Sequence, residues 1–335
     1  MLPPISRHET AGGVRIYRIP VQVFPHLLAY VHVVIAGSYV ALIDVGSGLG
    51  QSSVQLRAAF EALRESWGEK LSWQDVSRIV ITHAHIDHYG GLSSLREYCR
   101  APVAVHALDQ RVITHHRERL ILAISGVAAF LKRAGVAPER HKDLLQMYGW
   151  SKELFSSIEI ETVLEDGDCL DQLFTIYHTP GHCAGQVCLM VEDVMLTADH
   201  ILPGTSLYLS PESITPSMGV EHYFQSLHAI NKVPHVGLAL GGHGDPIGDI
   251  YATIVQIEAY QRGRLTRVLD SCSEPHTIAE LTSIHYPHVV GYDSILALGK
   301  VGAYVEYLDQ RGALEIANLE EVAADAHAAP RYRRV

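Results

Sequence analysis

The sequence predicts a layered α/β fold, because segments typical of strands and of helices alternate along much of the chain. Short runs rich in Val, Ile and Tyr, separated by Pro and Gly, predict strands at residues 14–24, 30–36, 39–45, 78–82 and 102–106. Apolar residues at helical spacing predict helices at 51–67 and 92–99. Such alternation is typical of proteins in which helices cover the faces of β-sheets.

The rest of the chain divides into three parts. Residues 107–157 are predicted to be a helical insertion over one face of the α/β body, broken at 134–138. Further strands at 158–164, 173–179, 186–191, 194–196 and 236–240, with a helix at 220–231, complete that body. Helices at 251–269, 277–284 and 293–309, followed by a short hairpin, predict a compact C-terminal module. The predicted domains are therefore 1–250 and 251–320, with a tail at 321–335.

Composition excludes several classes of protein. The chain has 335 residues, with 26 Lys or Arg against 37 Asp or Glu, which gives a net charge of −11. An acidic chain is a poor general binder of nucleic acid backbones. Five cysteines without a CxxC pair make a disulfide framework improbable, and this favours a reducing, cytoplasmic location. We also expect no membrane span, because no apolar run approaches about 20 residues. We expect no secretory signal, because the N-terminus has no basic region followed by an apolar core.

The residues that indicate chemistry begin directly after the predicted strand at 78–82. There the chain reads Thr-His-Ala-His-Ile-Asp-His, which places four donors, His83, His85, Asp87 and His88, within six residues. In extended backbone, residues two apart point to the same side, so His83 and His85 can face one metal ion. Imidazole and carboxylate groups bind zinc, and they also suit iron or manganese. A buried set of this density is costly without a cation, so we expect a metal site rather than a polar loop.

Three more donors lie at the ends of later predicted strands. His182 follows a Pro-Gly turn, Asp199 ends the segment Leu-Thr-Ala-Asp, and His243 follows two glycines. Each residue alone would more often belong to an ordinary loop, but together they supply the donors that the first cluster lacks. The order HxHxDH, His, Asp, His, with Asp44 in Ile-Asp-Val-Gly upstream, resembles the metallo-β-lactamase fold superfamily over about residues 14–248. The resemblance implies a four-layer αββα sandwich.

The resemblance also implies a role for each donor. His83, His85 and His182 would bind one metal, and Asp87, His88 and His243 would bind a second, with Asp199 bridging the two. Asp87 and Asp199 would be the catalytic residues. The implied cofactors are two divalent ions, with zinc expected first and iron or manganese as alternatives.

Residues around the donors are expected to support them. Asp44 would steady the HxHxDH turn by accepting hydrogen bonds, and His178 would be a neighbour of the site rather than a ligand. Two positions differ from the usual family pattern. Ala198 stands where glycine is common before the aspartate, and Gly242 stands where proline is common before the last histidine. Both changes affect turn geometry and leave the donors in place.

Hydrolysis is the expected reaction. Two divalent cations, two aspartates and a bridging hydroxide leave a net charge of about +1, and such a site lowers the pKa of bound water toward ~7. The hydroxide can then attack a small ester-like substrate, a thioester or lactone, as in glyoxalase II and its relatives. A single-strand endoribonuclease or phosphodiesterase is one alternative, and a mononuclear iron sulfur dioxygenase is another.

The charge of two segments, and a resemblance of one of them to a known domain, indicate which binding partners to expect. Residues 107–157 hold eight Lys or Arg against five Asp or Glu, so the insertion fits a contact with an anionic small-molecule substrate or a solvated helical face equally well. The segment 255–315 resembles the winged-helix-like domain that follows the hydrolase body in the β-lactamase-like protein 2 subgroup. It holds five Lys or Arg against eight Asp or Glu, so we expect no DNA binding and do not favour RNA. The apolar stretch at 120–131 fits a core helix, a lid or a homodimer contact equally well.

Overall fold

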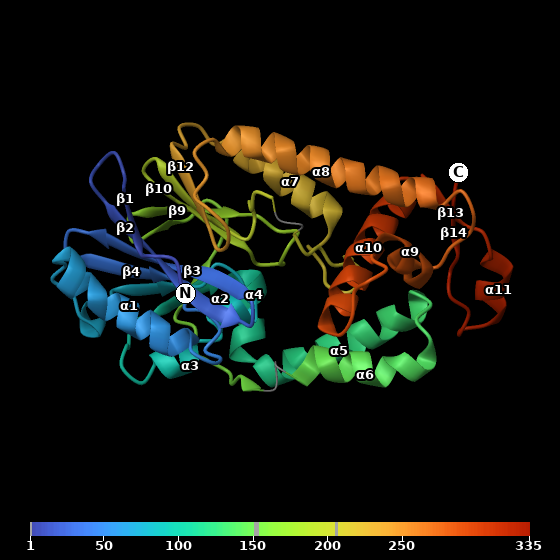
Figure 1. Cartoon of the computed structure of the whole chain (residues 1–335), viewed down its shortest axis with the longest axis horizontal. Coiled ribbons are helices and arrows are strands. Elements are labelled where there is room, and N and C mark those ends of the chain that lie inside the picture. Colours follow the sequence, from blue (N-terminus) through green and yellow to red (C-terminus); the bar gives the residue numbers. More distant parts are fainter. Residues whose placement is uncertain (1, 151–153, 205–206) are drawn as a thin grey trace.

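Two β-sheets packed face to face, with helices on both outer faces, form the body of the protein (Figure 1). The computed structural model describes residues 2–150, 154–204 and 207–335. The four layers agree with the αββα sandwich that the sequence predicts. Short strands that alternate with helices fold in this way because both faces of each sheet then become buried.

The first sheet contains seven strands among the described residues, in the order β1-β2-β3-β4-β5-β6-β7. Strands β1 to β4 pair in antiparallel fashion, and β4 to β7 pair in parallel. Their bounds are β1 Ser6–Glu9, β2 Arg15–Phe24, β3 Leu27–Ala36, β4 Tyr39–Ile43, β5 Arg78–Val80, β6 Val103–His106 and β7 Thr162–Leu164. Because β4 and β5 run in the same direction, the loops that follow them lie at one edge of the sheet.

The second sheet contains five strands among the described residues, in the order β12-β11-β10-β9-β8. Their bounds are β8 Cys169–Leu170, β9 Phe174–His178, β10 Val187–Val191, β11 Val194–Ala198 and β12 Leu238–Gly241. Strand β10 is antiparallel to both β9 and β11, and β12 is parallel to β11. The carboxyl ends of β9, β11 and β12 therefore lie at the same edge.

Three buried clusters hold the layers together. Between the sheets, Ile43 and Val80 of the first pack with Phe174 and Leu189 of the second. On the outer face of the first sheet lie the helices α1 (Ser52–Trp67), α2 (Ile86–Tyr89) and α3 (Leu92–Leu95), with a 3₁₀ turn at Trp73–Asp75. On the outer face of the second sheet lie α7 (Val220–Ile230) and the start of α8 (Ile250–Ser271).

The helical insertion differs from its expected position over one face of the α/β body. It forms α4 (Ala107–Thr114), α5 (His116–Arg133) and α6 (Pro138–Trp150), and the predicted range 107–157 also includes 151–153, which lie outside the described residues. Helix α4 contacts β6 and β7, whereas α6 contacts the C-terminal helix α10 (Tyr292–Gln310). Figure 1 shows α5 and α6 beside α10, away from the sheets. The apolar side chains of α5, among them Phe130, are buried there with those of α10.

The C-terminal residues contain three helices, as the sequence predicts, but the expected short hairpin is replaced by two strands that are separated along the chain by α11 (Leu319–Ala324). Helices α8, α9 (Ile278–His285) and α10 pack together, and β13 (Leu314–Ile316) pairs with β14 (Tyr332–Arg334). Residues 321–335 are not simply the tail expected from the sequence, because they hold β14 and the end of α11. The winged-helix-like assignment stays a prediction. No helix in the described part of the chain is long and apolar enough to cross a membrane.

Candidate metal centre

Seven histidine and aspartate side chains lie close together at the edge of the two sheets where strands β5, β9, β11 and β12 end. They form two groups, in each of which one donor atom per residue lies within 4.8 Å of the others. The first group is His83, His85 and His182, and the second is Asp87, His88, Asp199 and His243. The structure thus brings together all seven donors expected from the sequence. They come from the loop after β5, from α2, and from the loops after β9, β11 and β12.

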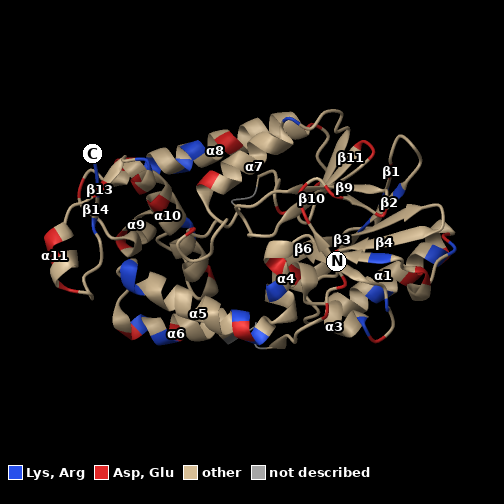
Figure 2. Ribbon diagram, turned by 180° about the vertical axis from the view of Figure 1, so that it is seen from behind, with Lys and Arg blue, Asp and Glu red and all other residues tan. Residues whose placement is uncertain are grey.

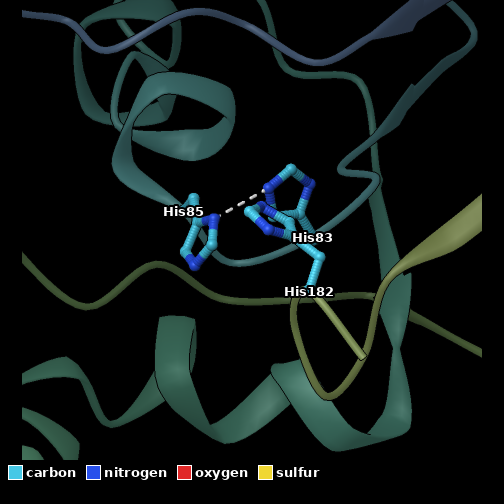
Figure 3. A group of neighbouring side chains, drawn as sticks. All are labelled: His83, His85 and His182. Atoms are coloured by element: carbon cyan, nitrogen blue, oxygen red, sulfur yellow. Dashed lines mark hydrogen bonds between the residues drawn. The ribbon is translucent and has the colours of Figure 1, made fainter. Parts of the chain in front are cut away.

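The first group consists of three imidazoles that face one another (Figure 3). His83 Nε2 and His85 Nδ1 are 3.0 Å apart, and His182 enters from the loop between β9 and β10. The other ring nitrogen of His182, Nδ1, lies 2.8 Å from the carbonyl oxygen of Tyr208, which leaves Nε2 directed into the group. Gly181 allows this turn because its φ of 126° is a conformation that L side chains rarely adopt.

The second group pairs two imidazoles with two carboxylates. His243 Nε2 lies 3.3 Å from Asp87 Oδ2, and His88 Nε2 lies 3.8 Å from the same carboxylate oxygen. His243 is held from behind, because its Nδ1 contacts the carbonyl oxygen of Leu28 on β3. The four side chains come from both sheets, so this group forms only when the sheets pack.

Asp199 lies between the two groups. One oxygen, Oδ2, is 3.6 Å from His182 Nε2 and 3.5 Å from His243 Nε2. The other oxygen, Oδ1, is 3.5 Å from His88 Nε2. A single carboxylate therefore faces donors of both groups, which is the arrangement required of a bridging ligand.

Asp44 supports the HxHxDH turn through three hydrogen bonds. Its carboxylate accepts from the backbone N–H and from the hydroxyl of Thr82, each at 2.8 Å, and it lies 2.8 Å from His88 Nδ1. The last contact orients the ring so that Nε2 points toward Asp199. The structure therefore places Asp44 where the sequence expects a supporting residue.

The expected neighbour His178 stands further from the donors. Its Nε2 lies 2.8 Å from the carbonyl oxygen of Ala184, and its ring stacks on His106 with centroids 3.9 Å apart. Neither of these contacts joins His178 to one of the seven donors. His178 therefore contacts the loop that carries His182 rather than the donors themselves.

Asp109 at the start of α4 is a supporting residue that the sequence does not reveal. Its buried carboxylate accepts hydrogen bonds from the backbone N–H groups of Ala84 at 2.7 Å and Gly185 at 3.0 Å. It also accepts from the thiol of Cys183 at 3.3 Å, so this cysteine is hydrogen-bonded away from the donors. Asp109 thus joins the turn of His83 and His85 to the turn of His182. The one local signal is an acidic residue in the first turn of a helix, which is too common to identify it.

The two unusual turn residues have different consequences. Ala198 has a φ of 45°, in the left-handed region where glycine would be unstrained, and its side chain is buried. Gly242 has no space for a side chain, since an added Cβ would lie 2.6 Å from Asp199 Oδ1 and 2.8 Å from His88 Cε1. The backbone after β12 therefore packs directly against the second group.

Burial and charge give the two groups different protonation behaviour. Burial lowers the pKa of His85 to about 3 and the pKa of His83 well below its usual value, so these imidazoles are neutral. Burial would also lower the pKa of His88 and His243, but the carboxylate of Asp199 above all raises both. The carboxylates of the second group thus require positive charge beside them, from protonated imidazoles or from a cation.

The donor set fits metal ions. Within the described residues, His88 Nε2, His182 Nε2 and Asp199 Oδ1 are buried without a hydrogen-bond partner. Buried polar atoms are rarely left in this way, and here the three atoms point at the groups themselves. Neutral imidazoles with unused lone pairs and ionised carboxylates are the forms that bind zinc. His83, His85 and His182 could hold one ion, and Asp87, His88 and His243 a second, with Asp199 facing both.

Comparison with known proteins agrees with this geometry. A model of the metallo-beta-lactamase superfamily matches residues 26–252. The probable metallo-hydrolase YqjP of Bacillus subtilis is 24% identical over 298 residues, which cover 84% of this chain and 88% of that protein. The acyl-coenzyme A thioesterase MBLAC2 of Bos taurus is 29% identical over 146 residues, which cover 40% of this chain and 44% of the thioesterase.

Solved structures share the fold over nearly the whole chain. The metallo-beta-lactamase family protein TTHA1429 of Thermus thermophilus has a TM-score of 0.77 and 24% identity, covering 96% of this chain and 98% of that one. A beta-lactamase domain protein from Burkholderia ambifaria has a TM-score of 0.75 and 21% identity, covering 98% and 94%. The family match spans more than half of the sequence and includes every donor of the site. The chain therefore belongs to the metallo-β-lactamase superfamily.

Proposed function

We propose that this protein is a binuclear metal-dependent hydrolase of a small ester-like substrate, a thioester or a lactone. The observation that carries the proposal is the position of Asp199, whose Oδ2 lies 3.6 Å from His182 Nε2 in the first group and 3.5 Å from His243 Nε2 in the second. One carboxylate within reach of two adjacent donor sets suits a pair of cations that share a ligand. The family match and the relatives named as hydrolases support the same class of activity.

The two donor groups and the residues that support them would have different roles. Three imidazoles, those of His83, His85 and His182, would hold one ion, and Asp87, His88 and His243 would hold the other. Divalent ions bound there would activate water for attack at neutral pH and stabilise the negative charge that develops on the attacked group. Asp44 and Asp109 would hold the turns that carry the donors in place while the substrate binds. We expect zinc, with iron or manganese as alternatives.

A thioester is favoured among the substrates by the similarity to the acyl-coenzyme A thioesterase of Bos taurus, which covers 40% of this chain and 44% of the thioesterase. Nucleic acid is not favoured by the charge distribution. Figure 2 shows basic and acidic segments interleaved along the ribbons of α4, α5 and α6. Arg111 pairs with Glu118 at 2.8 Å, and Arg133 lies 3.8 Å from Glu306, so part of the basic charge of the insertion is already paired.

Elemental analysis of the purified chain beside a substrate panel tests the proposal. We expect about two zinc, iron or manganese ions per chain and turnover of a thioester or lactone. About one iron per chain with oxidation of a thiol-derived substrate would instead indicate a dioxygenase. Cleavage of RNA that weakens steeply with salt would instead indicate a nuclease.

Replacing the shared carboxylate tests the role of Asp199. Asp199→Ala should release metal from both groups and abolish most activity, beyond the about 10–100-fold loss seen when only a supporting residue is changed. Asp143→Ala on the exposed face of α6 is the matched control and should change neither metal content nor turnover. Two ions per chain with full turnover in the Asp199→Ala variant would contradict the assignment.

A further inference from the structure

Arg18 on β2 is a buried cation close to the metal centre. Its side chain is 4% exposed, and its Nε has no hydrogen-bond partner among the described residues. Its guanidinium carbon lies 3.1 Å from the centroid of the Tyr30 ring, so a cation–π interaction with that ring stabilises part of the positive charge. Burial lowers the pKa of Arg18, which means that keeping a guanidinium here costs free energy. Such a residue is expected to have a specific role.

The guanidinium and its neighbours on β3 hold one turn of the second sheet. Arg18 donates a hydrogen bond from Nη2 to the carbonyl oxygen of Gly244. The backbone N–H of Tyr30 donates to the carbonyl oxygen of Gly242 at 2.7 Å. Between these two residues, the His243 ring contacts the carbonyl oxygen of Leu28 through Nδ1. Three consecutive residues after β12 are therefore fixed from the first sheet.

This turn lacks the local side-chain support that holds His88. His243 is flanked by Gly242 and Gly244, and Gly244 has a φ of 71°. Neither neighbour has a side chain that could restrain the backbone, so the turn is held by backbone contacts, among them the Gly242 N–H, which donates to the Ala198 carbonyl oxygen at 2.8 Å. His88, in contrast, lies on a helical turn and is oriented by the carboxylate of Asp44.

We propose that Arg18 is a positioning residue of the second metal group. By binding the Gly244 carbonyl oxygen and stacking on Tyr30, it fixes the turn so that His243 Nε2 stays 3.3 Å from Asp87 Oδ2 and 3.5 Å from Asp199 Oδ2. The inference rests on the proposed function, since it assumes that His243 binds a metal. It adds that the affinity of one of the two ions depends on a cation in the first sheet.

Zinc titration of the full chain against a chromogenic chelator tests the inference. In Arg18→Met, we expect the affinity of one zinc ion to fall about 10-fold or more, as for other residues that orient a ligand, while the other ion is affected little. Arg18→Lys should recover part of the loss, because it restores a donor and a charge. Arg15→Met, on the same strand but paired with Glu69 at 2.6 Å, is the matched control and should leave both affinities unchanged.

The outcomes separate this inference from the proposed function. Two zinc ions with unchanged affinities in Arg18→Met would overturn the inference and leave the binuclear site standing. Equal loss of both ions, or a lower unfolding temperature of the apoprotein with no selective loss, would show a merely structural role. If Arg18→Met does not fold, Tyr30→Leu removes the stacked ring and should give the same selective loss, whereas unchanged affinities there would refute the role. A wild-type chain that binds fewer than two ions would contradict the proposed function itself.

Discussion

At the scale of single residues, the second donor group is the most closely packed part of the site. The Cα of Gly242 faces both Asp199 and His88, and an added Cβ would come closer to each than real Cβ atoms do. The peptide groups of Gly242 are also engaged, with its N–H donating to the Ala198 carbonyl oxygen at 2.8 Å. The turn therefore has little freedom to move away from a side chain.

Gly242→Ala should consequently displace Asp199 or His88. We expect zinc affinity to fall by at least about 10-fold, the loss that follows when the support of a metal ligand is disturbed. The measurement is zinc titration with a competing chelator. Gly248→Ala is the control, since an added Cβ there meets nothing within 4 Å and should leave zinc binding unchanged. Equal zinc affinity in the two variants would show that the site tolerates the added methyl group.

The sequence predicts the donors better than their supports. HxHxDH places four donors by local spacing alone, and the superfamily pattern adds His182, Asp199 and His243. Asp109 escapes prediction because the amides that it binds belong to residues 84 and 185, which only the fold brings near it. Arg18 escapes for the same reason, since its partner Gly244 lies 226 residues away. A sequence motif therefore identifies the candidate ligands, whereas the residues that orient those ligands become their neighbours only in the folded structure.

At the scale of elements, α5 belongs to the buried core rather than to a movable lid. Its Phe130 is 4% exposed and packs against α10, where an added Cβ at Gly302 would lie 2.6 Å from the Phe130 ring. On the opposite face of the same helix, Ile121 is 57% exposed. The helix is therefore held by one face.

Truncating each face in turn tests this assignment. Phe130→Ala should lower the free energy of unfolding by about 3–5 kcal/mol, the cost of removing a buried aromatic side chain. Ile121→Ala should change it by no more than about 0.5 kcal/mol. Urea unfolding followed by circular dichroism measures both. Similar values for the two variants would mean that α5 is not part of the core.

A second element-scale contact joins β2 to the end of α1 and depends on pH. Arg15 Nε and the Tyr17 hydroxyl each lie 2.6 Å from Glu69 Oε1. The hydrogen bond from Arg15 above all lowers the pKa of Glu69 below its value in the unfolded chain. The stability that this carboxylate contributes is therefore present at neutral pH and is lost as the pH falls through its folded-state pKa.

Glu69→Gln should remove that pH-dependent contribution. We expect the variant to be less stable than the wild type at pH 7 by at most about 1 kcal/mol, because the pair is partly exposed. The difference should shrink as the pH is lowered from 6 toward 3, which urea unfolding at each pH can follow. A difference that stays constant or grows at low pH would contradict the role of the charged form.

Long elements are predicted more reliably than short ones. The predicted helix at 220–231 lies within one residue of α7, and the predicted helix at 251–269 lies within two residues of α8. The strands β1, β8 and β14 have two to four residues, and no periodicity can develop over so short a run. They form because neighbouring strands offer free backbone groups, and this depends on tertiary structure.

At the scale of the whole molecule, one buried cluster crosses the predicted boundary between residues 250 and 251. It includes Phe130 of the insertion, Met190 of the second sheet, Leu227 of α7 and Val301 of α10. Helix α8 begins after its N-cap Asp249, at that boundary, and continues from the second sheet to the C-terminal helices. Sequence patterns indicate which face of each helix or strand is apolar, but they do not indicate which other element packs against that face. This shared core therefore could not be predicted.

A shared core should make the chain unfold as one unit. We expect a single calorimetric transition that zinc shifts as a whole to higher temperature, because a ligand that binds only the folded chain stabilises it. At a free zinc concentration a hundredfold above Kd, the stabilisation should be about 3 kcal/mol per site. Two transitions, of which zinc shifts only one, would show that the C-terminal module folds independently of the metal-binding body.

Anomalous X-ray scattering at the zinc edge, from crystals of the full chain grown with zinc, tests the proposed pair of metal ions most directly. We expect two peaks, one bound by His83, His85 and His182 and the other by Asp87, His88 and His243, with an oxygen of Asp199 close to each. Zinc–ligand distances should be about 2.0–2.2 Å. A single peak, or peaks remote from Asp199, would contradict a binuclear centre in this protein.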